Sequence, residues 1–167
     1  MHDTAKSNAK KFVDTYCKNM NENTKVVEFG SAGDTTIRSM FPSVDYKGID
    51  MSTGLNVDIV CNNRNTPFET ESINIVVSSS CFEHDKCFWM SFLEMCRIVK
   101  PSGYIYICVP SEGPYHGYPG DCWRFYKDSW EALKDWAKEN NYSVSIVESY
   151  IHPNGIWRDN ICVFQKD

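Results

Sequence analysis

The sequence predicts an α/β fold, doubly wound around a mostly parallel seven-stranded sheet that ends in an antiparallel hairpin. Three observations support this prediction. Short apolar runs alternate along the chain with stretches of helical periodicity, as in a parallel sheet covered by helices on both faces. The last two runs flank the turn 152–155 and can pair antiparallel. The length of 167 residues allows one domain.

Each expected element has a local signal. The predicted strands cover residues 25–29, 46–50, 57–60, 73–77, 104–109, 142–150 and 157–165. The predicted helices cover residues 1–20, 34–41, 86–99 and 128–140. The first helix has apolar residues at helical spacing, and the second stops at Pro42. Asp128, three residues before Glu131, predicts a capping box for the last helix.

Composition narrows the function classes. The chain has 17 basic and 22 acidic residues and a net charge of -5, which argues against a nucleic-acid partner. A mean hydropathy of -0.43 without a long apolar run predicts no transmembrane helix and no membrane partner. No signal peptide is visible, and the 8 cysteines form no C-x-x-C pair. We therefore expect a cytoplasmic protein with reduced thiols.

The residues that follow the first two strands predict a ligand site. The small residues of the loop 30–33 let the backbone approach a ligand closely. Asp50 lies 20 residues after Gly30, the offset of a carboxylate that accepts ribose hydroxyls. Thr35 breaks the G-x-G-x-x-G pattern, which excludes a nicotinamide dehydrogenase. The carboxylate of Glu28 would repel pyrophosphate but suits a cationic sulfonium.

At this point the sequence resembles the class I S-adenosylmethionine-dependent methyltransferases. VVEFGSAG is similar to their first motif, YKGID to their second, and TPFETESINIVVSSSCFEH to the segment around their fourth strand. RIVKPSGYIYICVP resembles the helix, turn and strand that lead to the fifth. The resemblance covers roughly residues 25–109, and PYHGYPGDCWRFYKD looks like the following loop of one bacterial-type branch. It implies a small Methyltransferase-11-like domain with a Rossmann-like fold, S-adenosylmethionine as cofactor and S-adenosylhomocysteine as product.

The resemblance also implies the residues of a cofactor site. Asp50 would bind the ribose and Met51 would pack on the adenine ring. Asn62 stands where the family usually has an acid for the adenine amino group, and its carbonyl oxygen can accept the same hydrogen bond. The methionine portion would lie against Glu28, Gly30, Ser31, Ala32 and Gly33. The remaining implied cofactor residues are Asp58, Ser80, Cys81 and Phe82.

The glycine loop departs from the family pattern at two positions. Ala32 replaces the usual middle glycine, and Asp34 replaces the last glycine. We expect Asp34 to cap the following helix.

The candidate acceptor side is the loop 111–126. Methyl transfer from a sulfonium is a direct displacement, which needs a general base only when the acceptor loses a proton. His116 is the predicted base, and His84 and Asp121 are further catalytic candidates. Arg124 is predicted to clamp an acceptor anion. The predicted acceptor contacts also include the aromatic residues Tyr115, Trp123 and Tyr126.

Structural alternatives exist for these residues. Glu83 and His84 precede a helix and can satisfy its free amides. The aromatic residues of the loop, including Trp123, can simply pack it. No third ligand is spaced near His116 and Asp121, so we expect no metal site.

The predicted organisation is a single domain, 1–167, and its function is methyl transfer to a small-molecule or glycan-type acceptor. Its parts are an N-terminal helix 1–20, a cofactor-binding core 25–109, an acceptor-side loop 111–126, and a C-terminal helix and hairpin 128–167. The alternative is a catalytically inactive S-adenosylmethionine-binding module that serves as a regulatory or partner subunit. The altered glycines favour this alternative, whereas Asp50 and the polar, aromatic loop favour the enzyme.

Overall fold

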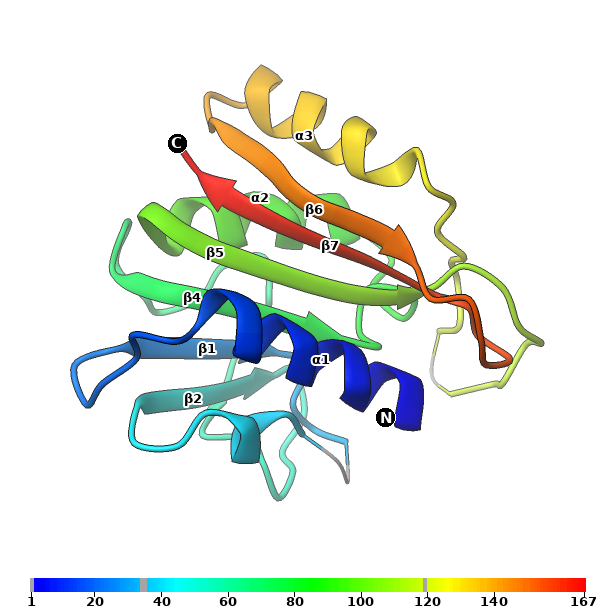
Figure 1. Cartoon of the computed structure of the whole chain (residues 1–167), viewed down its shortest axis with the longest axis horizontal. Helices are drawn as coiled ribbons and strands as arrows, with labels where there is room; N and C mark the ends of the chain where they lie inside the picture. Colours follow the sequence, from blue (N-terminus) through cyan, green and yellow to red (C-terminus); the bar gives the residue numbers. More distant parts are fainter. Residues whose placement is uncertain (1, 34–35, 119) are drawn as a thin grey trace.

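The computed structural model describes residues 2–33, 36–118 and 120–167, and in this part of the chain seven strands form one sheet (Figure 1). The strands are β1 (Lys25–Phe29), β2 (Asp45–Asp50), β3 (Ile59–Val60), β4 (Ile73–Ser79), β5 (Val99–Pro110), β6 (Val144–Ile151) and β7 (Asp159–Lys166). Their order is β3-β2-β1-β4-β5-β7-β6. β1 to β5 pair in parallel, and β7 runs antiparallel between β5 and β6. The predicted fold class is confirmed.

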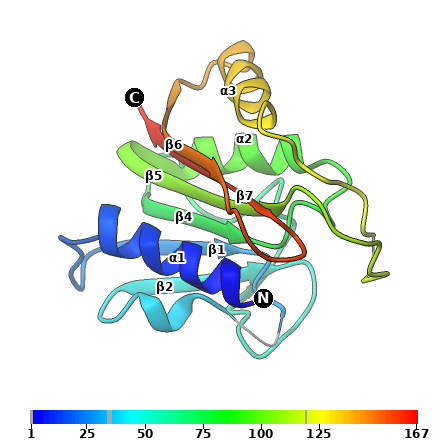
Figure 2. The same ribbon diagram turned by 45° about the vertical axis from the view of Figure 1, so that its right-hand side comes forward.

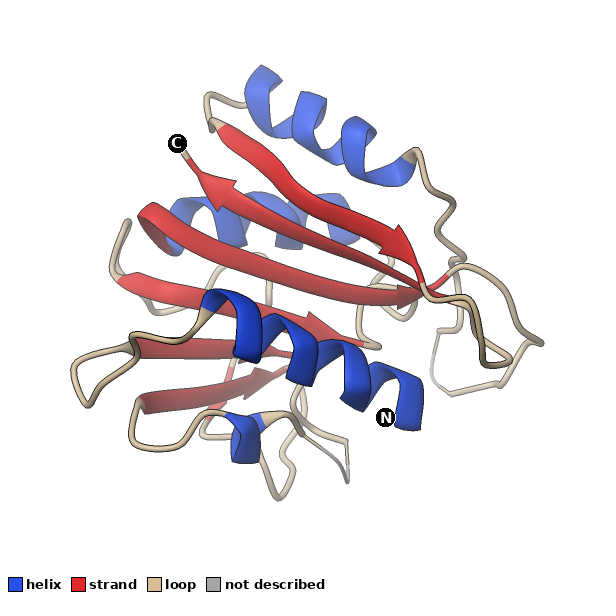
Figure 3. Ribbon diagram, viewed as in Figure 1, coloured by secondary structure: helices blue, strands red, loops and turns tan. Residues whose placement is uncertain are grey.

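Helices cover both faces of the sheet (Figures 1, 2 and 3). α1 (Asp3–Tyr16) lies on one face, where the ring of Phe12 stacks on Tyr106 of β5 at 4.7 Å between centroids. α2 (Phe88–Ile98) and α3 (Ser129–Glu139) lie on the other face, where Phe92 and Trp130 pack against Phe164 of β7. Two hydrophobic cores therefore hold the sheet, one on each side. Among the described helices, none is long and apolar enough to cross a membrane.

The second predicted helix is wrong in its length. Within 34–41, the described residues contain one short 3-10 helix, η1 (Arg38–Met40), and the predicted cap Asp34 lies outside the described residues. The hydroxyl of Thr36 accepts the N–H of Arg38 (3.1 Å), which fixes a side-chain turn at the start of this segment. Too few residues remain before Pro42 to close successive α-helical hydrogen bonds.

Other boundaries also differ from the prediction, and β5 begins at Val99, five residues before the predicted strand 104–109. The first helix ends at Tyr16, four residues earlier than predicted, and β3 is shorter than the predicted strand 57–60. The predicted capping box is wrong. Asp128 has nearly helical dihedral angles (φ -81, ψ -6) and its side chain makes no capping hydrogen bond. Its backbone carbonyl instead accepts the N–H of Ala132 (3.3 Å).

The parallel strands bring several loops to one edge of the sheet. β1, β2, β4 and β5 end at this edge, and the loop 111–126 and the start of α1 lie beside it (Figure 1). The connections that follow β2 and β3 contain no helix in this described part of the chain. Most candidate site residues therefore lie on loops at the carboxyl ends of the strands, and Glu28 and Asp50 lie in the last residues of β1 and β2. Open α/β sheets bind ligands at this edge.

Candidate active site

The loop after β1 is held tightly against its two neighbouring strands. The N–H groups of Gly30 and Ser31 both donate to the carbonyl of Ile49 in β2 (2.9 and 3.1 Å). Gly30 has a φ of +82, and a Cβ on it would lie 2.4 Å from Sγ of Cys81. Glycine is therefore required for the ends of β1 and β4 to approach each other. The hydroxyl of Ser31 is buried and has no hydrogen-bond partner among the described residues.

Asp50 joins the end of β2 to this loop. Its Oδ2 accepts the N–H of Ala32 (3.2 Å), and its Oδ1 accepts the N–H of Ser52 (3.0 Å). A carboxylate offers about four acceptor sites, so each oxygen can accept one further hydrogen bond. The neighbouring Met51 is 63% exposed at the same edge. The structure thus places a fixed carboxylate and an exposed apolar side chain beside the glycine loop.

Glu28 is engaged by the protein itself. Its buried carboxylate accepts hydrogen bonds from the hydroxyl of Tyr46 (2.9 Å), the hydroxyl of Thr36 and the N–H of Ile37 (3.5 Å). Burial raises the pKa of Glu28, and these hydrogen bonds partly offset the rise. Glu28 therefore positions the segment after the glycine loop, and its direct contact with the methionine portion stays a prediction.

Asp58 is also engaged by the protein. Its Oδ2 accepts the N–H of Gly48 (2.7 Å) and a guanidinium N–H of Arg38. Partial burial raises the pKa of this carboxyl, but the hydrogen bonds from Gly48 and Arg38 outweigh it, and the pKa of Asp58 is lowered. Asp58 links β2 to η1, so the structure assigns it a positioning role rather than a place in the open site.

The residues predicted past the third and fourth strands have mixed positions. Oδ1 of Asn62, predicted for the adenine amino group, accepts the N–H of Arg64 (3.0 Å). Phe82 is wholly buried in the core, so its predicted place lining the site is wrong. Ser80 has a φ of +53 at the carboxyl end of β4, a strained conformation for a residue other than glycine, and Cys81 lies beneath Gly30.

Arg124 organises the acceptor-side loop. It forms a bidentate ion pair with Asp121 (2.6 and 2.9 Å) and donates to the carbonyls of Pro114 and Trp123 (both 2.8 Å). The guanidinium that was predicted to clamp an acceptor anion is instead paired with Asp121, whose side chain is 1% exposed. The hydrogen bonds from Arg124 hold the pKa of Asp121 well below its usual range. Asp121 is thus ionised, and the ion pair fixes the shape of the loop.

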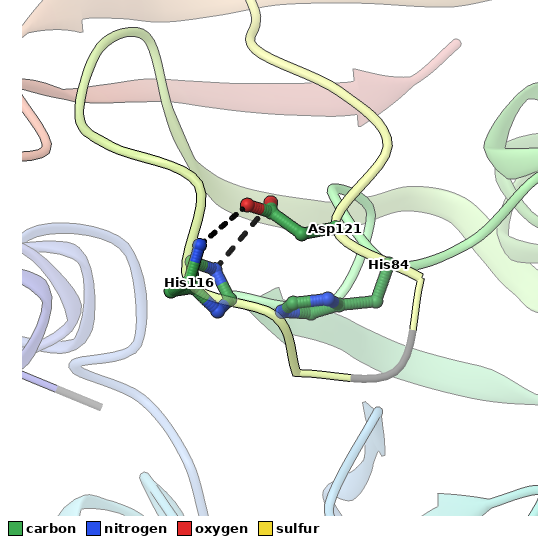
Figure 4. A group of neighbouring side chains, drawn as sticks. All are labelled: His84, His116 and Asp121. Atoms are coloured by element: carbon green, nitrogen blue, oxygen red, sulfur yellow. Dashed lines mark hydrogen bonds and ion pairs between the residues drawn. The ribbon is translucent and has the colours of Figure 1, made fainter.

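The three predicted catalytic residues lie together (Figure 4). His84 follows β4, whereas His116 and Asp121 come from the loop after β5. Oδ2 of Asp121 accepts the backbone N–H of His116 (3.0 Å), and Oδ1 lies 3.4 Å from Nε2 of the same histidine. The His84 and His116 rings meet edge to face at 4.9 Å between centroids. One potential ligand atom from each of the three residues lies within 4.8 Å of the others.

Glu83 is a neighbour of this cluster that the sequence analysis did not select as a site residue. Its side chain is 3% exposed, its Oε2 has no hydrogen-bond partner among the described residues, and burial raises its pKa to about 8. Its Oε1 lies 3.8 Å from Nε2 of His84. Its backbone carbonyl accepts the N–H groups of Cys122 and Trp123 (2.7 and 3.2 Å), which anchors the acceptor-side loop to the end of β4.

The alternative role of Glu83 and His84 at the helix start is wrong. α2 begins later, at Phe88, and Asp85 accepts the N–H of Cys87 (2.9 Å). An aspartate just before an apolar helical pattern is a known signal for this role.

The aromatic residues of the loop differ in exposure. Tyr115 and Tyr126 are 77% and 72% exposed, whereas Trp123 is 37% exposed. The indole N–H of Trp123 donates to the carbonyl of Asp85 (3.0 Å), and its ring packs edge to face on Phe88. Trp123 therefore packs the loop, and the two tyrosines remain open for acceptor contact.

Comparison with known proteins finds one matching sequence profile and several structures with a similar fold. Residues 33–107 match the sequence profile of a methyltransferase domain. The fold resembles that of the YcgJ protein from Bacillus subtilis, with 11% identity, 99% of each chain covered and a TM-score of 0.69. It also resembles 1,6-didemethyltoxoflavin-N1-methyltransferase from Burkholderia thailandensis, with 13% identity, 97% of this chain and 78% of that chain covered, and a TM-score of 0.69.

A third structure of the same fold is a putative sarcosine dimethylglycine methyltransferase from Galdieria sulphuraria, with 12% identity, 98% and 86% of the two chains covered and a TM-score of 0.69. No curated protein matches the sequence. At these identities the structural likeness shows the fold, and the sequence profile identifies methyltransferase-like sequence in residues 33–107. This match covers less than half of the chain, and together with the fold it supports the predicted class I S-adenosylmethionine-dependent methyltransferase family.

Proposed function

We propose that the chain binds S-adenosylmethionine across the ends of β1, β2 and β4 and transfers its methyl group to a small-molecule or glycan-type acceptor. The observation that carries this proposal is that Asp50 joins the end of β2 to the glycine loop. Its carboxylate is held by the N–H groups of Ala32 and Ser52, and it keeps free acceptor sites for the ribose hydroxyls. The related enzyme from Burkholderia thailandensis was crystallised with a small acceptor and S-adenosylhomocysteine, which supports the same use of this fold.

The remaining cofactor contacts follow from the same edge of the sheet. The loop at Gly30 and Ser31 would face the methionine portion, with the buried hydroxyl of Ser31 as a candidate hydrogen-bond partner. The exposed Met51 would lie against the adenine ring, where burial of both apolar surfaces stabilises the complex. Residues 25–109 are then the cofactor-binding core, and the loop 111–126 is the acceptor side.

The reaction is a displacement at the methyl carbon. The acceptor atom attacks this carbon, the carbon–sulfur bond breaks, and its electron pair returns to sulfur to give neutral S-adenosylhomocysteine. An acceptor O–H or N–H must then release a proton, and the imidazole rings of His84 and His116 are the candidate acceptors of this proton. Tyr115 and Tyr126 present exposed rings that suit a flat heterocycle or the apolar face of a sugar. We place the reaction in the cytoplasm, where the free cysteines stay reduced.

Calorimetric titration with S-adenosylhomocysteine tests the cofactor site. Asp50→Asn should weaken binding roughly 10- to 100-fold, because hydrogen bonds to a charged acceptor are each worth about 1.5–3 kcal/mol. Asp45→Asn is the matched control, since Asp45 lies at the opposite end of β2 and forms an ion pair with the exposed Lys47 (3.6 Å). It should leave the affinity unchanged.

Three outcomes separate the hypotheses. No binding of S-adenosylhomocysteine or S-adenosylmethionine by the folded wild-type chain would overturn the proposal. Equal affinity of Asp50→Asn and the wild type would remove Asp50 from the cofactor site. Tight binding without methyl transfer to a panel of flat heterocycles, small amines and sugars would favour the inactive binding module.

A further inference from the structure

The cluster of His84, His116 and Asp121 has the donor set of a metal site (Figure 4). We propose that it binds one divalent transition-metal ion, with Zn²⁺ as the best match, through one nitrogen of each histidine and one carboxylate oxygen. Catalytic zinc sites use such nitrogen and oxygen donors, and three protein ligands leave one position open. Mg²⁺ and Ca²⁺ prefer oxygen donors and fit this set poorly. The structure thereby supplies the third ligand, His84, that the spacing along the sequence does not reveal.

The distance between His116 and Asp121 suits an ion better than a direct hydrogen bond. Nε2 of His116 lies 3.4 Å from Oδ1 of Asp121, beyond the roughly 2.7–3.2 Å of an N–H···O hydrogen bond. Two ligand atoms that each lie about 2.1 Å from a tetrahedral zinc ion are about 3.4 Å apart. A ligand atom of His84 already lies within 4.8 Å of both others. A shift of about 1.5 Å at the His84 ring would complete the set.

Unpartnered buried atoms beside the cluster are an independent observation. Nδ1 of His84 and Oε2 of Glu83 are buried and have no hydrogen-bond partner in the described part of the chain. Glu83 is 3% exposed, and such buried polar atoms are almost always paired in folded proteins. Histidine ligands usually donate their second ring N–H to a carboxylate. Glu83, with Oε1 at 3.8 Å from Nε2 of His84, is placed to be that carboxylate.

Asp121 can accept hydrogen bonds from Arg124 and bind the ion at the same time. Its Oδ2 accepts from Arg124 and from the backbone of His116, whereas its Oδ1 accepts one hydrogen bond from the described residues, donated by Arg124 (2.6 Å). The second lone pair of Oδ1 is therefore available to the ion. The positive charge of Arg124 opposes a cation, and the ionised carboxylate of Asp121 offsets that charge.

An ion at this position would also explain how the acceptor is activated. A hydroxyl bound at the open position of zinc ionises near neutral pH, and its proton passes to solvent. The resulting oxygen would attack the methyl carbon, and both histidines would act as ligands. This catalytic role rests on the proposed methyl transfer, whereas the binding of the ion does not.

The test is a calorimetric titration of the full chain, first reduced and treated with a chelator, with ZnCl₂. We expect one Zn²⁺ per chain and no binding of Mg²⁺. His84→Gln and His116→Gln should each weaken binding more than about 100-fold, since even an outer-shell change costs about 10- to 100-fold. Glu83→Gln should weaken it about 10-fold. Two controls should bind as the wild type does: His152→Gln, outside the cluster, and Cys122→Ser, whose thiol lies next to Asp121 in sequence.

The outcomes are distinct. Zinc binding that persists in both histidine variants, or that is lost in Cys122→Ser, would overturn the proposal in favour of a thiolate site. The absorption of the Co²⁺-loaded wild type gives the same distinction without any variant, because thiolate ligands add an intense ultraviolet charge-transfer band. If the chain binds S-adenosylhomocysteine but does not bind Zn²⁺, only the metal site is overturned. If the chain binds Zn²⁺ but does not bind S-adenosylhomocysteine, the proposed function is overturned instead.

Discussion

The two halves of the sheet are held together in different ways. In the half formed by β1, β2 and β3, the strands also contribute to both hydrophobic cores, but carboxylates bind the backbone N–H groups of neighbouring segments, as Asp50 binds Ala32 and Asp58 binds Gly48. In the half formed by β4, β5, β6 and β7, buried aromatic and aliphatic side chains pack against α2 and α3. The first half leaves Met51, Leu55 and Val60 exposed at 63%, 94% and 54%.

This difference separates the two tasks of the fold. Dispersion and apolar burial in the second half stabilise the chain without a ligand. In the first half, the hydrogen bonds of Asp50 and Asp58 fix the loop backbone and leave apolar side chains exposed. Such a region can complete its packing when a cofactor binds. Substitutions in the two halves should therefore differ in their effect on the free energy of unfolding.

The largest effect is expected for Phe92→Ala in α2. Phe92 is fully buried and its ring lies 4.9 Å from that of Phe164. We expect the free energy of unfolding, measured by urea denaturation, to fall by about 3–5 kcal/mol through lost burial and a residual cavity. Val60→Ala in β3, an apolar truncation in the other half, should cost less than about 1 kcal/mol. Equal losses for the two variants would contradict the comparison.

The sequence predicts strands in both halves of the sheet, and β1 has the predicted bounds, 25–29. Long apolar patterns indicated β4, β5 and α2 because packing there depends on residue type and spacing, and these are visible in the sequence. The segment 34–41 was predicted as a helix from Ile37, Met40 and Phe41 alone. Its shape depends instead on Thr36, Glu28 and Tyr46, whose contacts join residues distant in sequence.

A smaller effect, dependent on pH, is expected for Asp58→Asn. The hydrogen bonds from Gly48 and Arg38 lower the pKa of Asp58 in the folded chain, against the opposing effect of burial. A carboxyl group with a lowered pKa contributes stability above its unfolded pKa of about 3.9, and this contribution is lost as pH falls through the folded value. The variant should be less stable by about 1 kcal/mol at pH 7, because the pair is partly exposed and screened by solvent.

The pH profile supplies the control for this prediction. The difference in stability between the wild type and Asp58→Asn should shrink as the pH falls below the unfolded pKa of about 3.9, and it should vanish once the carboxyl group of the folded chain is protonated. High salt should shrink the difference at pH 7, because it screens the ion pair with Arg38. A difference that stays constant from pH 7 to pH 3 would indicate lost packing rather than lost charge.

The candidate site shows the same limit of sequence reasoning. Asp50 and Gly30 were identified because their offset follows from one strand, one loop and the next strand. Arg124 was misjudged as an acceptor clamp, since its partner Asp121 is only three residues away and either role fits that spacing. The nearness of His84 to His116, 32 residues later, depends on the parallel pairing of β4 with β5, which no local pattern encodes.

The smallest effect on stability is expected for Met51→Ala, and it tests whether the exposed surface of the first half serves the cofactor. Because Met51 is 63% exposed, the free energy of unfolding should change by less than about 0.5 kcal/mol. Its affinity for S-adenosylhomocysteine should nevertheless fall about 5-fold, through lost apolar contact with the adenine ring. Leu55→Ala, in the same loop and 94% exposed, should change neither quantity. If Met51→Ala and Leu55→Ala bind S-adenosylhomocysteine equally well, Met51 does not contact the adenine ring, and its exposure has another cause.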